Sequence, residues 1–247
     1  MSCILIAILP PLILMCFFVP ARIRQKMQLA LMLKVSLSIL FVLYALFAVY
    51  RLYQNGYLAA HTLLFALVVL GGMVFGLLGD IWLACKNLTK ETRDFYLLSG
   101  FIFFLIGHLF YIVALVMTFA VTAAVWMLSL ACALVVVCMV YLLEKPLQLE
   151  YGSYKAVILV YSFVIAVTTA MPIWLTVFNH NANRIVTLIF AIGMVLFLIS
   201  DLVLSKLYFS KEGGKPHPLL YWANYLTYYG GQFTLVISLY FLGYLVI

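Results

Sequence analysis

Charged residues are scarce in this chain of 247 residues. Only 9% of its positions carry Asp, Glu, Lys or Arg, just seven of these are acidic, and 68% of all positions are hydrophobic. Soluble domains carry about 25% charged residues, so this chain has too few charges to cover a globular surface in water. The scarcity excludes a soluble globular domain and predicts a protein that folds in the lipid bilayer.

Cysteine pairs at metal-ligand spacing are also missing. The five cysteines show no C-x-x-C pattern, and disulfide frameworks and zinc sites depend on such spacing. We therefore expect no disulfide, no metal site and no cofactor. The net charge of +7 comes from short basic loops, so we expect contact with anionic membrane lipid and no nucleic-acid partner. The sequence leaves the oligomeric state open.

Long apolar runs dominate what is present. A membrane-spanning helix needs about 20 apolar residues, and eight runs are suitable, so we expect an all-α integral membrane protein forming a single bundle over residues 1–247. The expected transmembrane helices are 3–19, 27–50, 57–84, 95–117, 121–143, 154–178, 184–208 and 218–246. The break at 118–122 is the weakest, and without a turn there the count would be seven.

Basic residues concentrate in alternate loops. The first, third, fifth and seventh loops hold eleven of the 14 Lys and Arg residues, whereas the other loops hold only Arg51 and Arg184. Basic loops remain cytoplasmic, so both termini should be lumenal or extracytoplasmic. The compartment would be the endoplasmic reticulum in a eukaryote or the inner membrane in a bacterium.

The two halves of the chain resemble each other. "GLLGDIWL" (76–83) is similar to "FLISDLVL" (197–204), and the offset of 121 between Asp80 and Asp201 also separates Lys34 from Lys155. Four helices lie between corresponding segments, which predicts a parallel 4+4 repeat with its axis along the membrane normal.

Three charges lie inside predicted helices. An aspartate at mid-membrane costs roughly 2.5–3.5 kcal/mol, so Asp80 and Asp201 should face the bundle interior. Both lie about 7–8 Å below the interface at 1.5 Å per residue, and Lys34 lies at a similar depth. The alternative is structural, with the two aspartates pairing with Lys34 and Lys155.

Small and polar side chains form stripes on other helix faces. Gly72 and Gly76 precede Asp80 at spacings of four, which lets another helix approach closely. Further polar side chains repeat at i, i+3 or i+4 on two other helices: His108, Tyr111, Asn224, Tyr228 and Gln232. We expect these stripes to line one polar cavity open toward the cytoplasm, although hydrogen bonding between helices is the alternative for several of them.

At these residues the chain resembles the YhhN-like lysoplasmalogenase family of eight-helix membrane hydrolases. The matching pieces, spread from 34 to about 238, are Lys34, "GDIWL", "GHLFYI", "FLISDLVLSKLYF" and "YYGGQ". The resemblance implies hydrolysis of the vinyl ether bond of a lysoplasmalogen, a lysophospholipid, to a fatty aldehyde and a glycerophospho-ethanolamine or -choline.

That chemistry suits paired carboxyl groups. One protonated carboxyl would transfer a proton to the alkene carbon, and one carboxylate would stabilise the resulting oxocarbenium ion. We expect Asp80 and Asp201 to be this pair, with the assignment of the acid left open. Lys34 would bind the phosphate or tune a carboxylate, and the polar stripes would bind or orient the substrate and water.

Two other functions compete. An intramembrane aspartyl protease also uses two membrane aspartates, but "GLLGD" has one residue too many for the GxGD motif and the chain has no YD pair. A lipid or proton-coupled transporter also fits internal repeats and buried charges.

Overall fold

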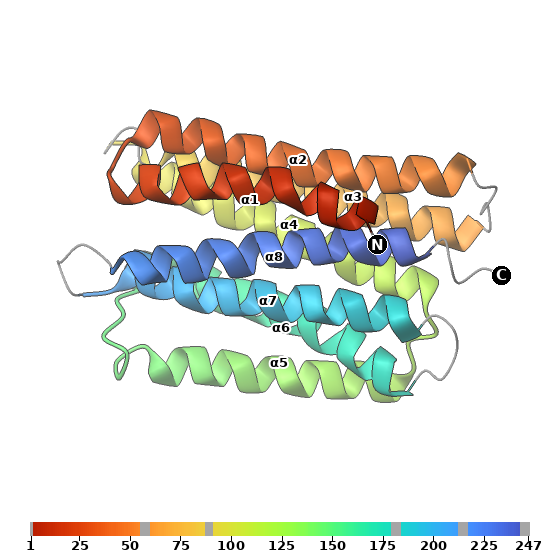
Figure 1. The fold of residues 1–247 in the computed structure, drawn as a ribbon. Coiled ribbons are helices and arrows are strands. Elements are labelled where there is room, and N and C mark those ends of the chain that lie inside the picture. The colour runs from red at the N-terminus through yellow and green to blue at the C-terminus, as the bar shows by residue number, and fades with distance from the viewer. Residues whose placement is uncertain (1, 55–59, 87–90, 179–183, 212–216, 243–247) are drawn as a thin grey trace.

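The structure is a computed structural model that describes residues 2–54, 60–86, 91–178, 184–211 and 217–242, with the side chains of residues 2–8 and 60 left out. Within these ranges the chain forms eight α-helices and no strand (Figure 1). Their bounds are α1 Ser2–Ile23, α2 Met27–Gln54, α3 Ala60–Cys85, α4 Arg93–Thr118, α5 Ala123–Leu143, α6 Lys155–Phe178, α7 Arg184–Phe209 and α8 Pro218–Leu242. A short 3₁₀ turn, Gly152–Tyr154, precedes α6.

The eight predicted helices are confirmed, with ends that shift by a few residues. The uncertain break is a true one, because α4 ends at Thr118 and the Thr122 side chain caps α5 by accepting a hydrogen bond from the Val125 N–H. An N-cap threonine satisfies a backbone donor that a helix start leaves without a partner. Positions 57–59 and 243–246 of the expected helices lie outside the described residues.

Six of the eight helices, α2 to α7, are long and apolar enough to cross a membrane. The described apolar part of α1, Leu9–Ile23, is shorter. Helix α8 does not qualify, because its tyrosines together with Asn224 and Gln232 lower its hydropathy. The chain is therefore a multi-pass membrane protein with at least six candidate spans.

One end of the bundle carries the basic residues. Helices α1, α3, α5 and α7 end there and the next helix begins there, on the left of Figure 1; we call this the basic end. A single bridge joins two of its connections, since the Glu150 N–H donates to the Phe209 carbonyl and the Lys211 N–H donates to that of Gln148. The bridge fixes the start of α6 beside the end of α7.

Close glycine contacts join two helix pairs. A Cβ atom on Gly107 of α4 would lie 2.9 Å from the carbonyl oxygen of Gly72 in α3. A Cβ atom on Gly231 of α8 would lie 2.8 Å from that of Gly193 in α7. Side chains larger than hydrogen would hold these backbones apart, so glycine sets the spacing within both pairs.

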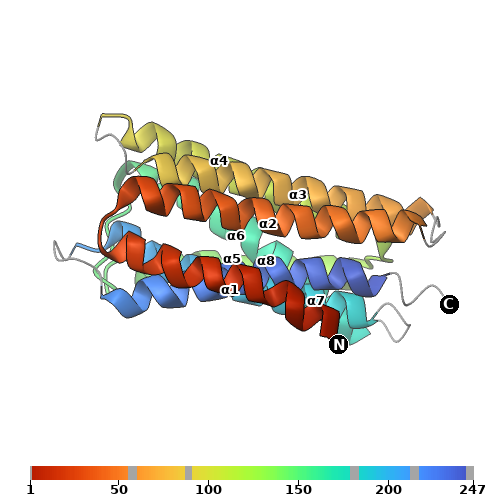
Figure 2. The ribbon, with the colours of Figure 1, turned by 45° about the horizontal axis from the view of Figure 1, so that its top comes forward.

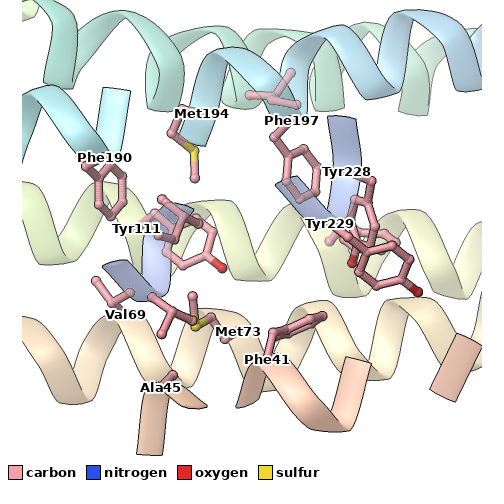
Figure 3. Close-up of a cluster of buried hydrophobic side chains, with 14 of the residues drawn as sticks. Phe41, Ala45, Val69, Met73, Tyr111, Phe190, Met194, Phe197, Tyr228 and Tyr229 are labelled. Atoms are coloured by element: carbon pink, nitrogen blue, oxygen red, sulfur yellow. The ribbon is translucent and has the colours of Figure 1, made fainter. Parts of the chain in front are cut away.

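The two sets of four helices meet through α2 with α8 and through α4 with α6. Helix α1 packs against both α2 and α8 (Figure 2), whereas α5 packs mainly against α6 and lies at the edge of the bundle (Figure 1). The shared core is apolar and aromatic. Figure 3 shows Tyr111 of α4 between side chains from α3 and α7 in this core.

Candidate active site

Asp80 lies in the most completely satisfied polar cluster of the described residues. Its side chain is nearly inaccessible, with 1% of the residue exposed. The Lys34 ammonium from α2 lies 2.8 Å from Oδ1. The hydroxyls of Ser38 and Tyr228 each donate to Oδ2 over 2.6 Å. An ammonium and two hydroxyl donors compensate the negative charge that the membrane interior disfavours.

Neighbouring groups hold this cluster in place. The Tyr229 hydroxyl of α8 donates to the Lys34 carbonyl, and the Ser38 hydroxyl also lies 3.0 Å from that oxygen. The cluster therefore ties α2, α3 and α8 together at the basic end.

Asp201 of α7 has a much sparser environment. The Tyr161 hydroxyl of α6 donates to its Oδ2. The two ion pairs of the described residues, Lys34 with Asp80 and Lys155 with Glu144, leave Asp201 without a cation. A protonated carboxyl group needs no cation, so this environment suits the neutral acid better than the anion.

Of the two ion pairs in the structural alternative, Lys34 with Asp80 is formed, whereas Lys155 pairs with Glu144 and not with Asp201. Lys155 is the first residue of α6, at the basic end, and its ammonium lies 2.7 Å from Glu144 just after α5. Its side chain is 38% exposed against 10% for Lys34. A lysine at a helix end can extend its ammonium into water. Lys155 therefore does not contact the buried Asp201 carboxyl group.

One pocket contains both aspartates. It lies between α2, α3, α4, α7 and α8, close to the basic end. Its lining residues are Lys34, Asp80, Leu83, Phe104, Ser200, Asp201, Leu204, Tyr208, Asn224, Tyr225 and Tyr228. Two carboxyl groups from distant parts of the chain thus face one enclosed volume, with different partners behind each.

Asn224 lines this pocket, but its amide is already bonded. The amide nitrogen donates to the carbonyl and hydroxyl oxygens of Ser200 in α7, both over 2.9 Å. The Ser200 hydroxyl donates to the Asn224 carbonyl in return. This reciprocal contact joins α7 to α8, as polar residues commonly join membrane helices.

The remaining predicted polar residues form a separate group. His108, Tyr111 and Gln232 are buried and do not line the pocket of the aspartates. Both ring nitrogens of His108, the Tyr111 hydroxyl and the Gln232 side-chain carbonyl have no hydrogen-bond partner among the described residues. Buried polar atoms without partners are costly, so these atoms are suited to a polar ligand or water. The expected single cavity for all the polar stripes is not seen.

His108 connects the two groups. Its ring lies 5.8 Å from that of Tyr111 and 5.9 Å from that of Tyr161, between ring centroids. Because Tyr161 donates to Asp201, the unpartnered nitrogens of His108 lie one side chain away from that carboxyl group.

Six polar residues of the site were missed in the sequence: Ser38, Tyr161, Ser200, Tyr208, Tyr225 and Tyr229. Ser38 had a signal, because it follows Lys34 by one helical turn and shares its face. The tyrosines had none that separates a hydrogen-bonding phenol from the many aromatic residues of a membrane helix.

In the described ranges, no three His, Cys, Asp or Glu side chains gather where they could hold a metal ion. Comparison with known families gives one result: the model of the YhhN family matches residues 29–239. This range contains both aspartates, Lys34, all of α3 to α7 and most of α2 and α8. Comparison with curated proteins and with solved structures gives no match.

Proposed function

The chain belongs to the YhhN family, and from this membership and the paired aspartates we propose a lysoplasmalogenase-like hydrolase. It cleaves the vinyl ether bond of a lysoplasmalogen to a fatty aldehyde and a glycerophospho-ethanolamine or -choline. One observation carries the proposal: Asp80 and Asp201 line the same pocket with unlike partners. Vinyl ether hydrolysis needs a proton donor and stabilisation of the resulting cation, and two carboxyl groups in different protonation states meet both needs.

The reaction consumes one water. A proton transfer to the alkene carbon farther from oxygen forms a C–H bond and leaves an oxocarbenium ion. Water then adds to the cationic carbon and loses a proton, which gives a hemiacetal. The hemiacetal hydroxyl then loses its proton as its oxygen forms the C=O bond of the aldehyde. At the same time the C–O bond to glycerol breaks and the oxygen of glycerol takes up a proton, so the aldehyde and the alcohol leave.

Asp201 is the acid in this scheme. It has a phenol donor on one oxygen and no ion pair among the described residues, so its other oxygen can carry the proton. After the transfer, the Asp201 carboxylate regains a proton from the attacking water, as in general acid–base catalysis. Tyr161 acts as a positioning residue that orients this carboxyl group.

Asp80 is the permanent anion. Its charge is maintained by Lys34, Ser38 and Tyr228 and stabilises the oxocarbenium ion across the pocket. The ion pair supports a tuning role for Lys34 rather than direct phosphate binding. His108, Tyr111 and Gln232 supply unpartnered polar atoms that orient water and the glycerol hydroxyl.

The architecture proposed with this function has all eight helices crossing the membrane as one bundle, with the basic end cytoplasmic by the positive-inside rule. It also contains the 4+4 repeat. Reciprocal packing supports the repeat, because the second helix of each set contacts the fourth helix of the other. The glycine contacts within α3–α4 and α7–α8 give further support.

Aldehyde release by the purified full-length protein tests the function. The wild-type protein in nanodiscs should convert lysoplasmalogen to aldehyde. Asp80→Asn and Asp201→Asn should each lower kcat by about 10²–10⁴-fold, the usual contribution of such a group. Asp94→Asn, an exposed aspartate at the start of α4, is the matched control and should keep wild-type turnover. A wild-type protein that binds the lipid without releasing aldehyde, as a transporter would, overturns the proposal.

A further inference from the structure

Three pockets meet at one side chain. Tyr208, near the end of α7, lines the pocket of the two aspartates and also lines two others on either side of it. One of these shares Asp201 and Leu204 with the aspartate pocket, and the other shares Lys34 and Tyr225. The three therefore adjoin, with the aspartates in the middle.

The first neighbouring pocket is an apolar groove between α5, α6 and α7. With the open space at its mouth included, it spans about 570 Å³, against about 320 Å³ for the aspartate pocket measured in the same way. Val136 and Val140 of α5 face Leu198 and Leu202 of α7 across it. Leu202 is 56% exposed, so the groove opens on the lipid-facing surface beside α5, the helix that packs mainly against α6. Its polar members lie at the inner end, where Asp201 and Tyr161 meet.

The second neighbouring pocket is basic. It lies between α1, α2, α3 and α8 and is lined by Arg22 and Lys34, with no acidic side chain in its lining. Lys86, only 5% exposed, places its ammonium 2.7 Å from the centroid of the Tyr208 ring that forms one wall.

Positive charges crowd around this second pocket. Burial holds the pKa of the Lys86 ammonium well below its ordinary value, and the nearby charges of Arg22 and Lys34 act in the same direction. Lys34 is already paired with Asp80, so the positive potential available to a further anion comes from Arg22 and Lys86, and such a potential attracts an anion. The pocket is thus complementary to a phosphate group.

We propose that the three pockets form one binding path for a single-chain phospholipid, with the hydrocarbon chain in the apolar groove and the phosphate in the basic pocket. The order of the pockets matches the order of groups along such a lipid: anion, glycerol, ether oxygen, chain. The assignment of the middle pocket to the reacting bond rests on the proposed function, whereas the two outer assignments concern binding alone. The chain reaches Asp201 laterally from the bilayer, through the opening between α5 and α7.

Chain binding is tested with a lipid that the enzyme cannot cleave. The probe is a lysophospholipid with a saturated C16 ether chain, and native mass spectrometry of the full-length protein measures its binding. Val136→Trp fills the groove and should weaken binding at least about tenfold, since each buried methylene contributes about 0.8 kcal/mol. Val135→Trp is the matched control, because Val135 is next to Val136 in the chain but is exposed and does not line the groove. It should bind as the wild type does.

A second pair of variants protects the test against misfolding. Leu202 is already exposed, so Leu202→Trp leaves the core intact and should also weaken binding of the C16 probe. Ile199→Trp, on an exposed face of α7 outside the groove, is its control. Binding of the C16 probe that is equal in all four variants overturns the assignment of the groove.

Phosphate binding is tested by comparing two probes on one variant. Arg22→Gln should weaken binding of the charged probe about tenfold and leave that of an uncharged C16 alkylglycerol unchanged, because only the first carries the anion. Arg24→Gln, at an exposed arginine just after the end of α1, should change neither. If Arg22→Gln affects both probes equally, the basic pocket is not the phosphate site.

The two proposals fail separately. A wild-type protein that cleaves lysoplasmalogen while Val136→Trp and Arg22→Gln bind normally keeps the hydrolase proposal and loses the path. A wild-type protein that binds the saturated probe with the predicted dependence and releases no aldehyde keeps the path and loses the reaction.

Discussion

The two halves of the molecule place the same residue in unlike surroundings. Each half carries an aspartate on its third helix, near the basic end, and each aspartate accepts from its second helix. Asp80 has an ammonium and two hydroxyl donors, whereas Asp201 has one phenol. Similar local sequence, "GDIWL" and "SDLVL", therefore does not decide which groups hold the carboxyl group. The side chains that neighbouring helices supply decide it.

The first helices of the two halves differ in the same sense. Helix α1 packs against α2 and α8 and borders a basic pocket, whereas α5 packs mainly against α6 and borders an apolar groove. An exact twofold arrangement would give two equal crevices. The basic pocket and the apolar groove are unequal, which suits the proposed ligand with one charged and one apolar end.

The largest expected effect concerns the two lysines separated by 121 residues. Lys34→Met should destabilise the protein by about 3–5 kcal/mol, because it leaves the buried Asp80 carboxylate without its cation. Lys155→Met should lose only a small fraction of that, since its ion pair with Glu144 is partly exposed, with 38% of the Lys155 side chain accessible. Unfolding of the purified variants in detergent, followed by tryptophan fluorescence, measures both.

The double variant Lys34→Met with Asp80→Asn sharpens this comparison. Both charges are then gone, so much of the lost stability should return, although activity should not. Equal destabilisation by Lys34→Met and Lys155→Met would show that the two lysines contribute alike to stability and would contradict the difference between their ion pairs.

The fold was predictable from the sequence because a spanning helix has a fixed length. Eight apolar runs gave eight helices, and the largest differences are at arginines that continue a helix, such as Arg22 in α1 and Arg51 in α2. A long side chain reaches polar surroundings from within a helix, so a charge does not always mark a loop.

The site was predictable only where charge gave a signal. The contact between Asp80 and Lys34 was predictable, because burying either charge alone in the membrane is costly. Tyr161 did not, because hydropathy treats a phenol that binds Asp201 like any other aromatic ring. The position of α5 at the edge was also hidden, since α5 is as apolar as its neighbours and composition does not report which helices touch.

Glycine substitutions compare the helix pairs α3–α4 and α7–α8. Gly72→Ala should cost about 1–3 kcal/mol through overpacking, because the new Cβ would lie 2.5 Å from the Tyr111 ring and 2.9 Å from a backbone oxygen. Gly193→Ala should cost less, since its nearest neighbour, at 3.0 Å, is the flexible end of Leu235. The same unfolding measurement ranks them.

Gly76→Ala is the control for both, because its Cβ would meet nothing closer than 3.6 Å. Gly76 is buried, but the new methyl group would make only ordinary van der Waals contact. Stability should therefore not fall, and the higher helix propensity of alanine should raise it by up to about 1 kcal/mol. A loss at Gly76 as large as that at Gly72 would mean that glycine does not set the spacing of α3 and α4.

Removing the phenol hydroxyl that donates to each aspartate tests which carboxyl group needs that hydrogen bond for catalysis. Tyr161→Phe should lower kcat about tenfold with little change in KM, because the phenol stabilises the Asp201 carboxylate that forms as the proton is transferred, and a hydrogen bond to a charged group contributes about 1.5–3 kcal/mol. Tyr228→Phe should lower kcat less, because Asp80 keeps Lys34 and Ser38. Steady-state kinetics of aldehyde release gives both values. A larger loss in Tyr228→Phe would reverse the assigned roles.

The smallest expected effect lies at the basic end, where Glu144 pairs with Lys155. The hydrogen bond from Lys155 holds the pKa of the Glu144 carboxyl below its ordinary value of 4.5, with a further contribution from the Tyr151 N–H. A lowered pKa in the folded state means that the pair stabilises the protein above about pH 4.5 and that this contribution is lost as the pH falls further. Glu144→Gln should therefore flatten the fall in thermal unfolding midpoint between neutral and acid pH.

The control is Glu150→Gln. Glu150 is an exposed glutamate six residues further on with no ion pair among the described residues, so this variant should keep the wild-type slope. The change should be slight, since water screens an exposed pair. Equal slopes in wild type and Glu144→Gln would leave the pair without a role in stability, in contrast to the buried pair of Lys34 and Asp80.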